Sequence, residues 1–398
     1  MTTTQVTVNE SIENIAADEW NRLVGDEYPF LRHEFLLAAE RSGSVSPETG
    51  WHPCHLSMRG CDDKLRAALP LYKKDHSWGE FVFDWAWARA YEQAGLAYYP
   101  KLVSAVPFTP APSRRLLLRD ATDTEAASRL LEAALVLADE SGCSSLHVLF
   151  PDAEDLDLLR DAGLRTRKDC QFHWHNDGYV DFDDFLAAFS SAKRKKTRRD
   201  RRRVVEAGIT FRRLHGGEID TATWNIVYRL ISLTFMRRGS MPYFGLEFFV
   251  EVSRSLPDNI LVILAEREDE PIAAAVFFES ERTLYGRYWG SNGHYDALHF
   301  ETCYYQGIDY CIDTKKQLFE PGTQGEHKVS RGFVPVPTWS AHWLRHPEFF
   351  AAIGNYLDEE RRHIERYMDA VDGRSPYRND RNRPNDPVLP ETRPRNRE

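Results

Sequence analysis

The sequence predicts a mixed α/β (α+β) protein with two tandem domains, each built on a mixed central sheet flanked by helices. The chain has 398 residues, which is too long for a single ordinary hydrophobic core. Hairpin, helix and strand patterns alternate along it, which is typical of α/β or α+β architecture. The halves also echo each other, because KLRAALPLY at 64–72 and EPIAAAVFF at 270–278 both follow an apolar strand and an acidic turn.

Composition narrows the class of protein. Hydrophobic residues make up 42% of the chain, which is enough for sizeable globular cores. The net charge of -10 argues against a protein that coats nucleic acid, although it leaves room for one local basic site. The six cysteines form no CxxC pair, which indicates reduced thiols in a cytosol. We see no signal peptide and no apolar run as long as a membrane span, so we expect a cytoplasmic protein.

We expect the first domain to cover residues 1–180. After a partly helical start, a hairpin has its arms at 54–59 and 65–72. A stripe of leucines and alanines predicts a helix over 123–141, and Gly142 fits its end. The other expected elements are an ordered aromatic wall at 91–112, strands at 145–150 and 170–174, and a helix at 153–162.

We expect the second domain to cover residues 181–371. Apolar residues between Phe182 and Phe189 share one face, which predicts a single long helix that continues to Gly208. Residues 372–398 are rich in Pro, Arg, Asn and Asp without apolar periodicity, so we expect a disordered or loosely attached tail. The other expected elements are a hairpin with arms at 259–266 and 271–279, strands at 209–214, 283–289 and 317–320, and helices at 222–237, 298–313 and 347–370.

Six long motifs carry a resemblance to a known family. They are GWHPCHL (50–56), HSWGEFVFDWAWARAY (76–91), YYPKL (98–102), PFTP (107–110), HFETCYYQGIDYCI (299–312) and FEPGTQGEHKVSRGF (319–333). On these motifs the chain resembles the bacterial predicted N-acyltransferases or peptidoglycan-biosynthesis proteins. These are relatives of the FemABX-type aminoacyl transferases within the GNAT superfamily. The resemblance covers most of the chain, from Trp20 to His346.

The resemblance implies two GNAT-like domains and transfer of an acyl group to an amine. Ordinary GNAT enzymes take that group from acyl-CoA, whereas FemABX relatives take an aminoacyl group from charged tRNA. The GNAT phosphate loop reads Q/R-x-x-G-x-G/A and holds the CoA pyrophosphate at a helix N-terminus. Here the nearest match is RYWGSN at 287–292, which ends in Asn and is separated from the helix by residues 294–297. This departure weakens the case for CoA at the loop, with Arg287 as the phosphate-binding candidate.

Acyl transfer to an amine needs a base for the attacking amine, donors for the oxyanion and an acid for the leaving group. The segment GEHK follows a short strand and a glycine-rich turn, and loops at strand ends commonly carry function. Glu326 or His327 could be the base, while Lys328 and Arg331 could hold an anionic group. The alternative is a polar surface loop, and the place of this segment in the family signature favours function.

His299, Glu301 and Tyr305 lie near the start of a helix that the resemblance turns toward the cleft. Glu301 and Tyr305 are four residues apart and share a helical face, whereas His299 points in a different direction. We expect an acid–base role for Glu301 and substrate contacts from His299 and Tyr305. The equally weighted alternative is capping by Glu301 and packing by the tyrosines.

Residues 193–203 contain nine basic residues in eleven, with Asp200 as the only acid. Self-repulsion along such a helix favours an anionic partner, such as the phosphates of tRNA or CoA or an anionic lipid. A solvated helix face is the alternative. The candidates for phosphate binding in this run are Lys193, Lys196, Arg199 and Arg203.

Asp84 and Trp85, close to Trp87 and Tyr91, could line a pocket for the acceptor. Core packing is the alternative, and it is favoured for both tryptophans. Two histidine-containing segments, HPCH at 52–55 and HWH at 173–175, lack the paired spacing of a structural zinc site, so we expect no metal.

Together these features predict an N-acyltransferase that uses an activated donor, with acyl-CoA as the first candidate, and a small-molecule or peptide amine as acceptor. Two alternatives stay open. One is a FemABX-like transferase that uses charged tRNA in cell-wall or peptide biosynthesis, and it predicts binding that weakens steeply with salt. The other is a non-catalytic module that binds a cell-wall precursor or nucleic acid, and it predicts binding without product.

Overall fold

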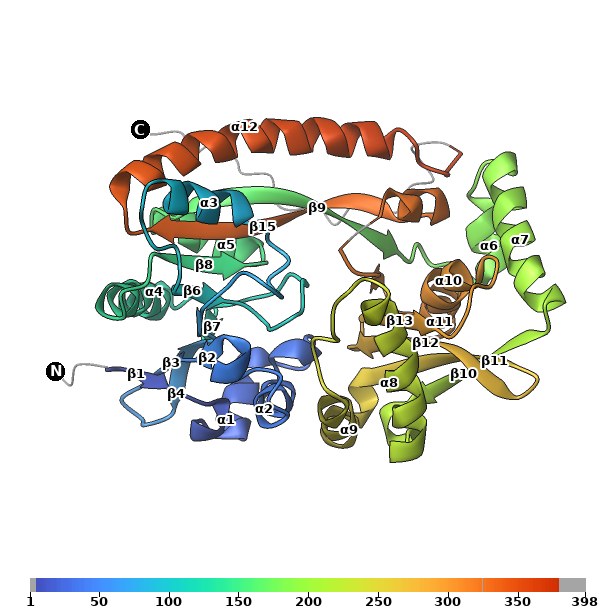
Figure 1. Cartoon of the computed structure of the whole chain (residues 1–398), viewed down its shortest axis with the longest axis horizontal. Helices are drawn as coiled ribbons and strands as arrows, with labels where there is room; N and C mark the ends of the chain where they lie inside the picture. Colours follow the sequence, from blue (N-terminus) through green and yellow to red (C-terminus); the bar gives the residue numbers. More distant parts are fainter. Residues whose placement is uncertain (1–4, 324, 379–398) are drawn as a thin grey trace.

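The structure is a computed structural model that describes residues 5–323 and 325–378. Two sheets form its framework (Figure 1). The smaller sheet has the order β1 (Val6–Asn9), β3 (His55–Arg59), β4 (Leu65–Leu69) and β7 (Leu117–Leu118). The larger sheet has the order β10 (Ile209–His215), β11 (Ile260–Arg267), β12 (Glu270–Glu279), β13 (Thr283–Ser291), β14 (Leu318–Glu320), β9 (Arg165–His175), β15 (Val334–Leu344), β8 (Ser145–Leu149), β6 (Lys101–Ser104), β5 (Tyr72–Lys74) and β2 (Trp51–Pro53).

The two halves follow the same plan. In the first half an antiparallel β3–β4 hairpin precedes a parallel β6–β8 pair, and in the second an antiparallel β11–β12 hairpin precedes a parallel β13–β14 pair. Each parallel pair is connected through a helix, α4 (Thr124–Glu140) or α11 (Gln306–Asp313), because parallel neighbours need a long crossover. The predicted fold class, a mixed α/β protein with tandem GNAT-like halves, is confirmed.

Strand β15 joins the halves into one sheet. It comes from the C-terminal part of the chain, yet it pairs with β8 on one side and with β9 on the other. The far end of β9 then pairs with β14, so that β9 bridges both halves (Figure 1). The sheet is therefore continuous across the boundary that we place at residue 180, and that boundary stays a prediction.

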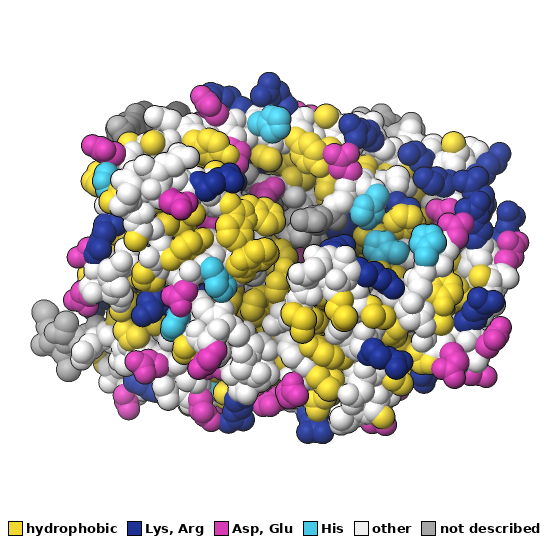
Figure 2. Space-filling view, viewed as in Figure 1, with side chains coloured by type: hydrophobic (Ala, Val, Ile, Leu, Met, Phe, Trp, Pro, Cys, Tyr) yellow, Lys and Arg dark blue, Asp and Glu magenta, His cyan; other side chains and the backbone are white. Residues whose placement is uncertain are grey.

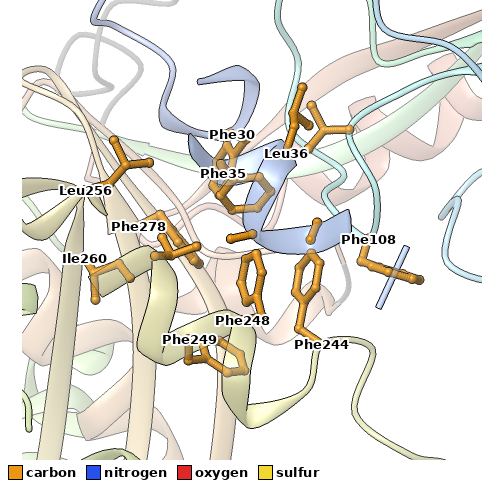
Figure 3. Packing of buried hydrophobic residues seen from close by; sticks show 14 of the residues in the cluster. Phe30, Phe35, Leu36, Phe108, Phe244, Phe248, Phe249, Leu256, Ile260 and Phe278 are labelled. Carbon is orange, nitrogen blue, oxygen red and sulfur yellow. The ribbon is translucent and has the colours of Figure 1, made fainter. Parts of the chain in front are cut away.

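A phenylalanine-rich core also spans both halves (Figure 3). Phe35 on α2 contacts Phe248 on α9 at 5.1 Å and Phe278 on β12 at 5.5 Å between ring centroids. Phe30 lies 5.2 Å from Phe278. All four side chains are fully or almost fully buried. The N-terminal helices therefore dock on the second half through edge-to-face and tilted ring contacts, which are favourable geometries for aromatic pairs.

Most helices lie where the sequence places them, with one correction. The prediction of a single long helix from residue 182 is wrong, because the helix is interrupted at Phe189 and Ser190. There the Ser190 amide donates a hydrogen bond to the Pro376 carbonyl at 2.8 Å. The helices are α1 (Ala17–Val24), α2 (His33–Arg41), α3 (Trp85–Gln93), α4 (Thr124–Glu140), α5 (Ala153–Asp161), α6 (Phe182–Ala187), α7 (Ser191–Glu206), α8 (Thr221–Met236), α9 (Leu246–Ser255), α10 (Leu298–Phe300), α11 (Gln306–Asp313) and α12 (Pro347–Asp372).

The C-terminal helix α12 lies along β9 and β15 (Figure 1). Beyond it, Tyr377 is buried and donates to the Gly332 carbonyl at 2.8 Å, so the first residues of the expected loose tail pack against the second half. Residues 379–398 of that tail lie outside the described residues. Across the described part of the chain, no helix combines the length and apolar character that crossing a membrane requires.

Replacing Phe35 by Ala should lower the free energy of unfolding by about 3–5 kcal/mol, because it removes a buried ring from the shared core. We expect one cooperative transition to shift as a whole in urea denaturation, since both halves use this ring. The control is Val136→Ala on α4, whose side chain is exposed, with an expected change within about 0.5 kcal/mol. Separate transitions for the two halves would contradict a shared core.

Candidate functional site

A cleft with a volume of about 710 Å³ lies between the two halves. One wall is the first-half segment 77–85 with Phe108 and Pro110, and the other comes from β13, His299 and the segment 321–328. Figure 2 shows the hollow near the middle of the molecule, with hydrophobic side chains on its left and histidine and basic side chains on its right. The cleft thus has an apolar side and a basic side.

The apolar wall is anchored by a buried lysine. Lys101 on β6 donates to Ser77 Oγ at 2.8 Å, to Glu80 Oε2 at 2.8 Å and to Asp84 Oδ2 at 2.5 Å. Burial raises the pKa of Asp84, but the Lys101 charge, His147 and hydrogen bonds from Lys101 and Ser77 together outweigh burial, and the pKa falls to about 2. Asp84, expected at the substrate, therefore holds the wall from behind, while Trp85 lines the cleft.

The basic wall contains a π-helical turn, Glu301–Tyr305, between α10 and α11. In a π turn residues five apart lie on one face, whereas in an α-helix those four apart do so. His299 and Tyr304 both line the cleft, with ring centroids 5.5 Å apart. Tyr305, the residue expected at the substrate, instead packs in the core against Phe182 at 5.9 Å.

Tyr304 and His327 form a hydrogen-bonded pair in the cleft, with 2.9 Å between Oη and Nε2. The rings of His299 and His327 lie 6.1 Å apart. Burial lowers the pKa of each histidine to about 4, and nearby positive charges, Arg331 among them, add to the effect. Both imidazoles are therefore uncharged at neutral pH and able to accept a proton.

Two buried cations form the floor of the cleft. The Arg287 side chain is 5% exposed, and its only ion pair with a described residue is a long one of 3.8 Å with Glu320. Among the described residues, its Nε and Nη2 atoms have no hydrogen-bond partner. Burial raises the pKa of Glu320 to about 7, although Arg287 opposes the shift. This guanidinium therefore keeps hydrogen-bonding capacity for an anionic group.

Lys328 is the second cation, buried and hydrogen-bonded to the Gly322 carbonyl. Burial and, to a smaller extent, the positive charge of Arg287 lower its pKa to about 7. An anion bound between the two side chains would relieve their mutual repulsion and restore the charge of Lys328. The floor is therefore suited to a carboxylate, a phosphate or a developing oxyanion.

The comparisons with known proteins can be set beside this geometry. A family model described as FemAB-like, peptidoglycan biosynthesis/recognition, matches residues 11–379. The chain belongs to the FemAB-like family. The FemAB-like chain matches no sequence among the curated proteins.

Solved structures share the fold of this FemAB-like chain. FemX is 12% identical with a TM-score of 0.50, covering 78% of this chain and 92% of FemX. L-PGS from Bacillus licheniformis is 13% identical with a TM-score of 0.50, covering 81% of this chain and 96% of L-PGS. The C-terminal domain of a putative lysylphosphatidylglycerol synthetase from Agrobacterium fabrum is 10% identical with a TM-score of 0.51, covering 85% and 95%. At these identities the likeness concerns the fold alone.

Two residues expected to act in acid–base chemistry lie outside the cleft of the FemAB-like chain. Glu301 is buried and pairs with Arg201 of α7 at 3.1 Å, and burial raises its pKa. Glu326 pairs with Arg374 at 2.7 Å near the surface. Both carboxylates therefore have structural partners, and the assignment of either as the base stays a prediction.

Arg331, expected to hold an anionic group, is buried with its guanidinium 3.4 Å from the centre of the Phe300 ring. It also donates to the His327 carbonyl at 2.5 Å. The structure thus places Arg331 behind His327, where it supports the backbone of that residue. Its positive charge is one cause of the low pKa of the imidazole.

The basic helix α7 lies at the edge of the molecule, away from the cleft lining (Figure 1). Arg203 pairs with Asp296 at 2.7 Å, whereas Lys193, Lys196 and Arg199 have no ion pair with any residue that the structure describes. The expected phosphate-binding run is therefore a surface separate from the cleft.

The altered phosphate loop is mostly strand. Residues 287–291 belong to β13, and Gly290 packs so closely on α8 that an added Cβ would lie 1.9 Å from the Leu230 carbonyl oxygen. The glycine therefore serves close packing of strand and helix.

Three residues that line the cleft could not be identified from the sequence: Tyr304, Arg238 and Phe81. For Tyr304, the only signal in the sequence was the tandem of tyrosines at 304 and 305.

Replacing Lys328 by Met should remove a pH-dependent part of the stability. The folded-state pKa is about 7 against an ordinary 10.5, so between these values the unfolded chain binds a proton that the folded chain lacks. The free energy of unfolding of the wild type should therefore rise from pH 7 to pH 10.5 relative to the variant, by roughly 2–5 kcal/mol. Urea denaturation across this window measures it. Lys195→Met on the exposed side of α7 is the control, and parallel pH profiles for wild type and Lys328→Met would refute the low pKa.

Proposed function

We propose that this FemAB-like chain transfers an acyl or aminoacyl group from an activated donor to an amine held in the cleft. The observation that carries the proposal is the pair of uncharged histidines facing a buried cationic floor. The histidines can accept a proton and the cationic floor can stabilise negative charge, and both line the same cavity. The family description supports an amine of a peptidoglycan precursor as acceptor.

His299 is the base that we favour. No hydrogen bond to its ring nitrogens is made by the residues that the structure describes, whereas Nε2 of His327 is engaged by Tyr304. His299 would take a proton from the amine as its nitrogen attacks the donor carbonyl carbon. A base with this role typically contributes about 10²- to 10⁴-fold to the rate.

The other groups would serve the remaining charges of the reaction. Negative charge that develops on the carbonyl oxygen would face Arg287 and Lys328. Burial raises the pKa of Tyr304 well above its ordinary value, so its hydroxyl stays protonated and can donate. When the bond between the carbonyl carbon and the leaving oxygen or sulfur breaks, Tyr304 would supply the proton, and the proton that His299 took from the amine would then restore the Tyr304 hydroxyl.

An aminoacyl ester is the donor that we favour over acyl-CoA. In the cleft, Arg287 is turned onto the rings of Phe30 and Tyr285 at 4.9 and 5.3 Å, and Gly290 is committed to packing on α8. This leaves the loop at 287–292 without the open glycine cradle that a pyrophosphate requires. Acyl-CoA, the first candidate from sequence, becomes the second candidate donor.

The variants His299→Ala and Tyr304→Phe should lower kcat/KM for transfer to a peptidoglycan stem peptide with a free amine. We expect a loss of about 10²- to 10⁴-fold for the first and a smaller loss of about tenfold for the second. The matched control is His363→Ala, an exposed histidine on α12 outside the cleft, which should retain the wild-type rate.

The assay supplies aminoacyl-tRNA, acetyl-CoA or a long-chain acyl-CoA as donor, with and without ribonuclease. Loss of product on ribonuclease treatment supports the aminoacyl donor, whereas product from acyl-CoA alone restores the first expectation from sequence. Unchanged rates for His299→Ala would remove it as the base. Binding of stem peptide without product from any donor would refute transfer and leave a recognition module.

A further inference from the structure

Four strongly exposed aromatic and methionine side chains lie at or next to the mouth of the cleft. Trp78 is 64%, Phe83 54%, Met236 62% and Met241 74% exposed. Throughout the described residues, no other tryptophan, phenylalanine or methionine is exposed to this degree. Such side chains are normally buried, so their concentration at one place marks a surface that contacts something apolar.

Two segments far apart in sequence form this mouth. Trp78 and Phe83 belong to the anchored wall of the first half, whereas Met236 ends α8 and Met241 lies in the loop that follows it. Ring contacts join the segments, with Phe81 5.7 Å from Tyr243. The two methionines thus stand within two residues of Phe235 and Tyr243, which line the cleft opposite the hydrophobic wall visible in Figure 2.

The exposed charge at the mouth comes from the second segment and is positive. The loop after α8, residues 237–245, contains no acid, and its Arg237 and Arg238 are exposed without an ion pair to the described residues. In the wall segment the two acids, Glu80 and Asp84, are buried on Lys101. This pattern runs against the net charge of -10 for the whole chain.

Further basic side chains lie on the same face. Figure 2 shows Lys and Arg side chains gathered at the right edge, over α7. Lys195, Lys196 and Arg199 of that helix are exposed and form no ion pair with described residues. One extended anionic surface would neutralise both the cleft mouth and α7, whereas a small ligand in the cleft would reach only the first.

We propose that the cleft mouth docks on the surface of a bilayer that contains anionic lipid. Trp78, Phe83, Met236 and Met241 enter the interfacial layer, and Arg237 and Arg238 contact the headgroups. Because the chain as a whole carries a net charge of -10, an anionic surface attracts this basic face and turns the cleft toward the lipid. The proposal goes beyond the transfer reaction and does not depend on it.

Co-sedimentation with vesicles tests this surface without any assay of activity. One set of vesicles is phosphatidylcholine alone, and the other contains equal parts of phosphatidylcholine and phosphatidylglycerol. We expect the full chain to sediment with the anionic vesicles only, and to be released at high salt. Recovery of the protein in the supernatant with both kinds of vesicle would overturn the proposal.

Two double variants separate the contributions. Arg237→Glu with Arg238→Glu should weaken partitioning by roughly a hundredfold or more, because each basic residue near an anionic surface contributes measurably and reversal adds repulsion. Met236→Ser with Met241→Ser should weaken it by about tenfold. These side chains are exposed, so the variants should fold, which thermal unfolding checks.

Matched controls lie elsewhere on the surface. Arg362→Glu on α12 and Val136→Ser on α4 change equally exposed residues and should leave partitioning unchanged. Equal binding of wild type and both double variants would overturn the proposal. So would sedimentation of the wild type alone as an oligomer that the methionine variant abolishes, since the mouth would then bind a second copy of the chain.

Discussion

The pairing of β15 between β8 and β9 is the constraint on which the rest of the structure depends. It carries the C-terminal part of the chain back into the first half and makes one continuous sheet from both. The segment 321–328, which forms the basic wall, leads directly into this strand. Once β15 is paired, that wall can face only the first-half segment 77–85, so the cleft is a consequence of the sheet.

Buried charge at the cleft is the second feature on which the proposed function depends. Arg287, Glu320 and Lys328 are buried, and their charges are incompletely paired among the described residues. Such groups cost stability, because removal of a charge from water is repaid only by good partners. By contrast, Lys101 behind the opposite wall is fully paired. The incompletely hydrogen-bonded guanidinium of Arg287 thus lies on the side of the cleft where an anionic ligand could complete it.

Much of the fold could be predicted from periodicity. The leucine and alanine stripe over 123–141 corresponds to α4, and the alternating segments at 259–279 correspond to the β11–β12 hairpin. These are local patterns that tertiary contacts reinforce. The break between α6 and α7 could not be predicted, because it depends on a hydrogen bond from Ser190 to Pro376, far along the chain.

The candidate site was predictable in its segments and less so in its residues. Trp85, His299, His327 and Lys328, from the six motifs, come together in the cleft with Arg287 of the altered phosphate loop. With α-helical spacing, Glu301 and Tyr305 are four residues apart and share a face. The π turn shifts this register by one residue and brings Tyr304 to the cleft. No local signal distinguishes a π turn from an α turn, and the burial of Glu301 depends on Arg201, a hundred positions away.

The central claim is that donor and acceptor meet between the two halves, and hydrogen–deuterium exchange tests it most directly. Exchange is followed for the full chain alone, with aminoacyl-tRNA, with acetyl-CoA and with stem peptide. The account predicts slower exchange in segments 77–85 and 321–328 and in the π turn when donor or acceptor binds. Protection confined to α7, or to the far side of the sheet, with the cleft segments unchanged, would contradict it.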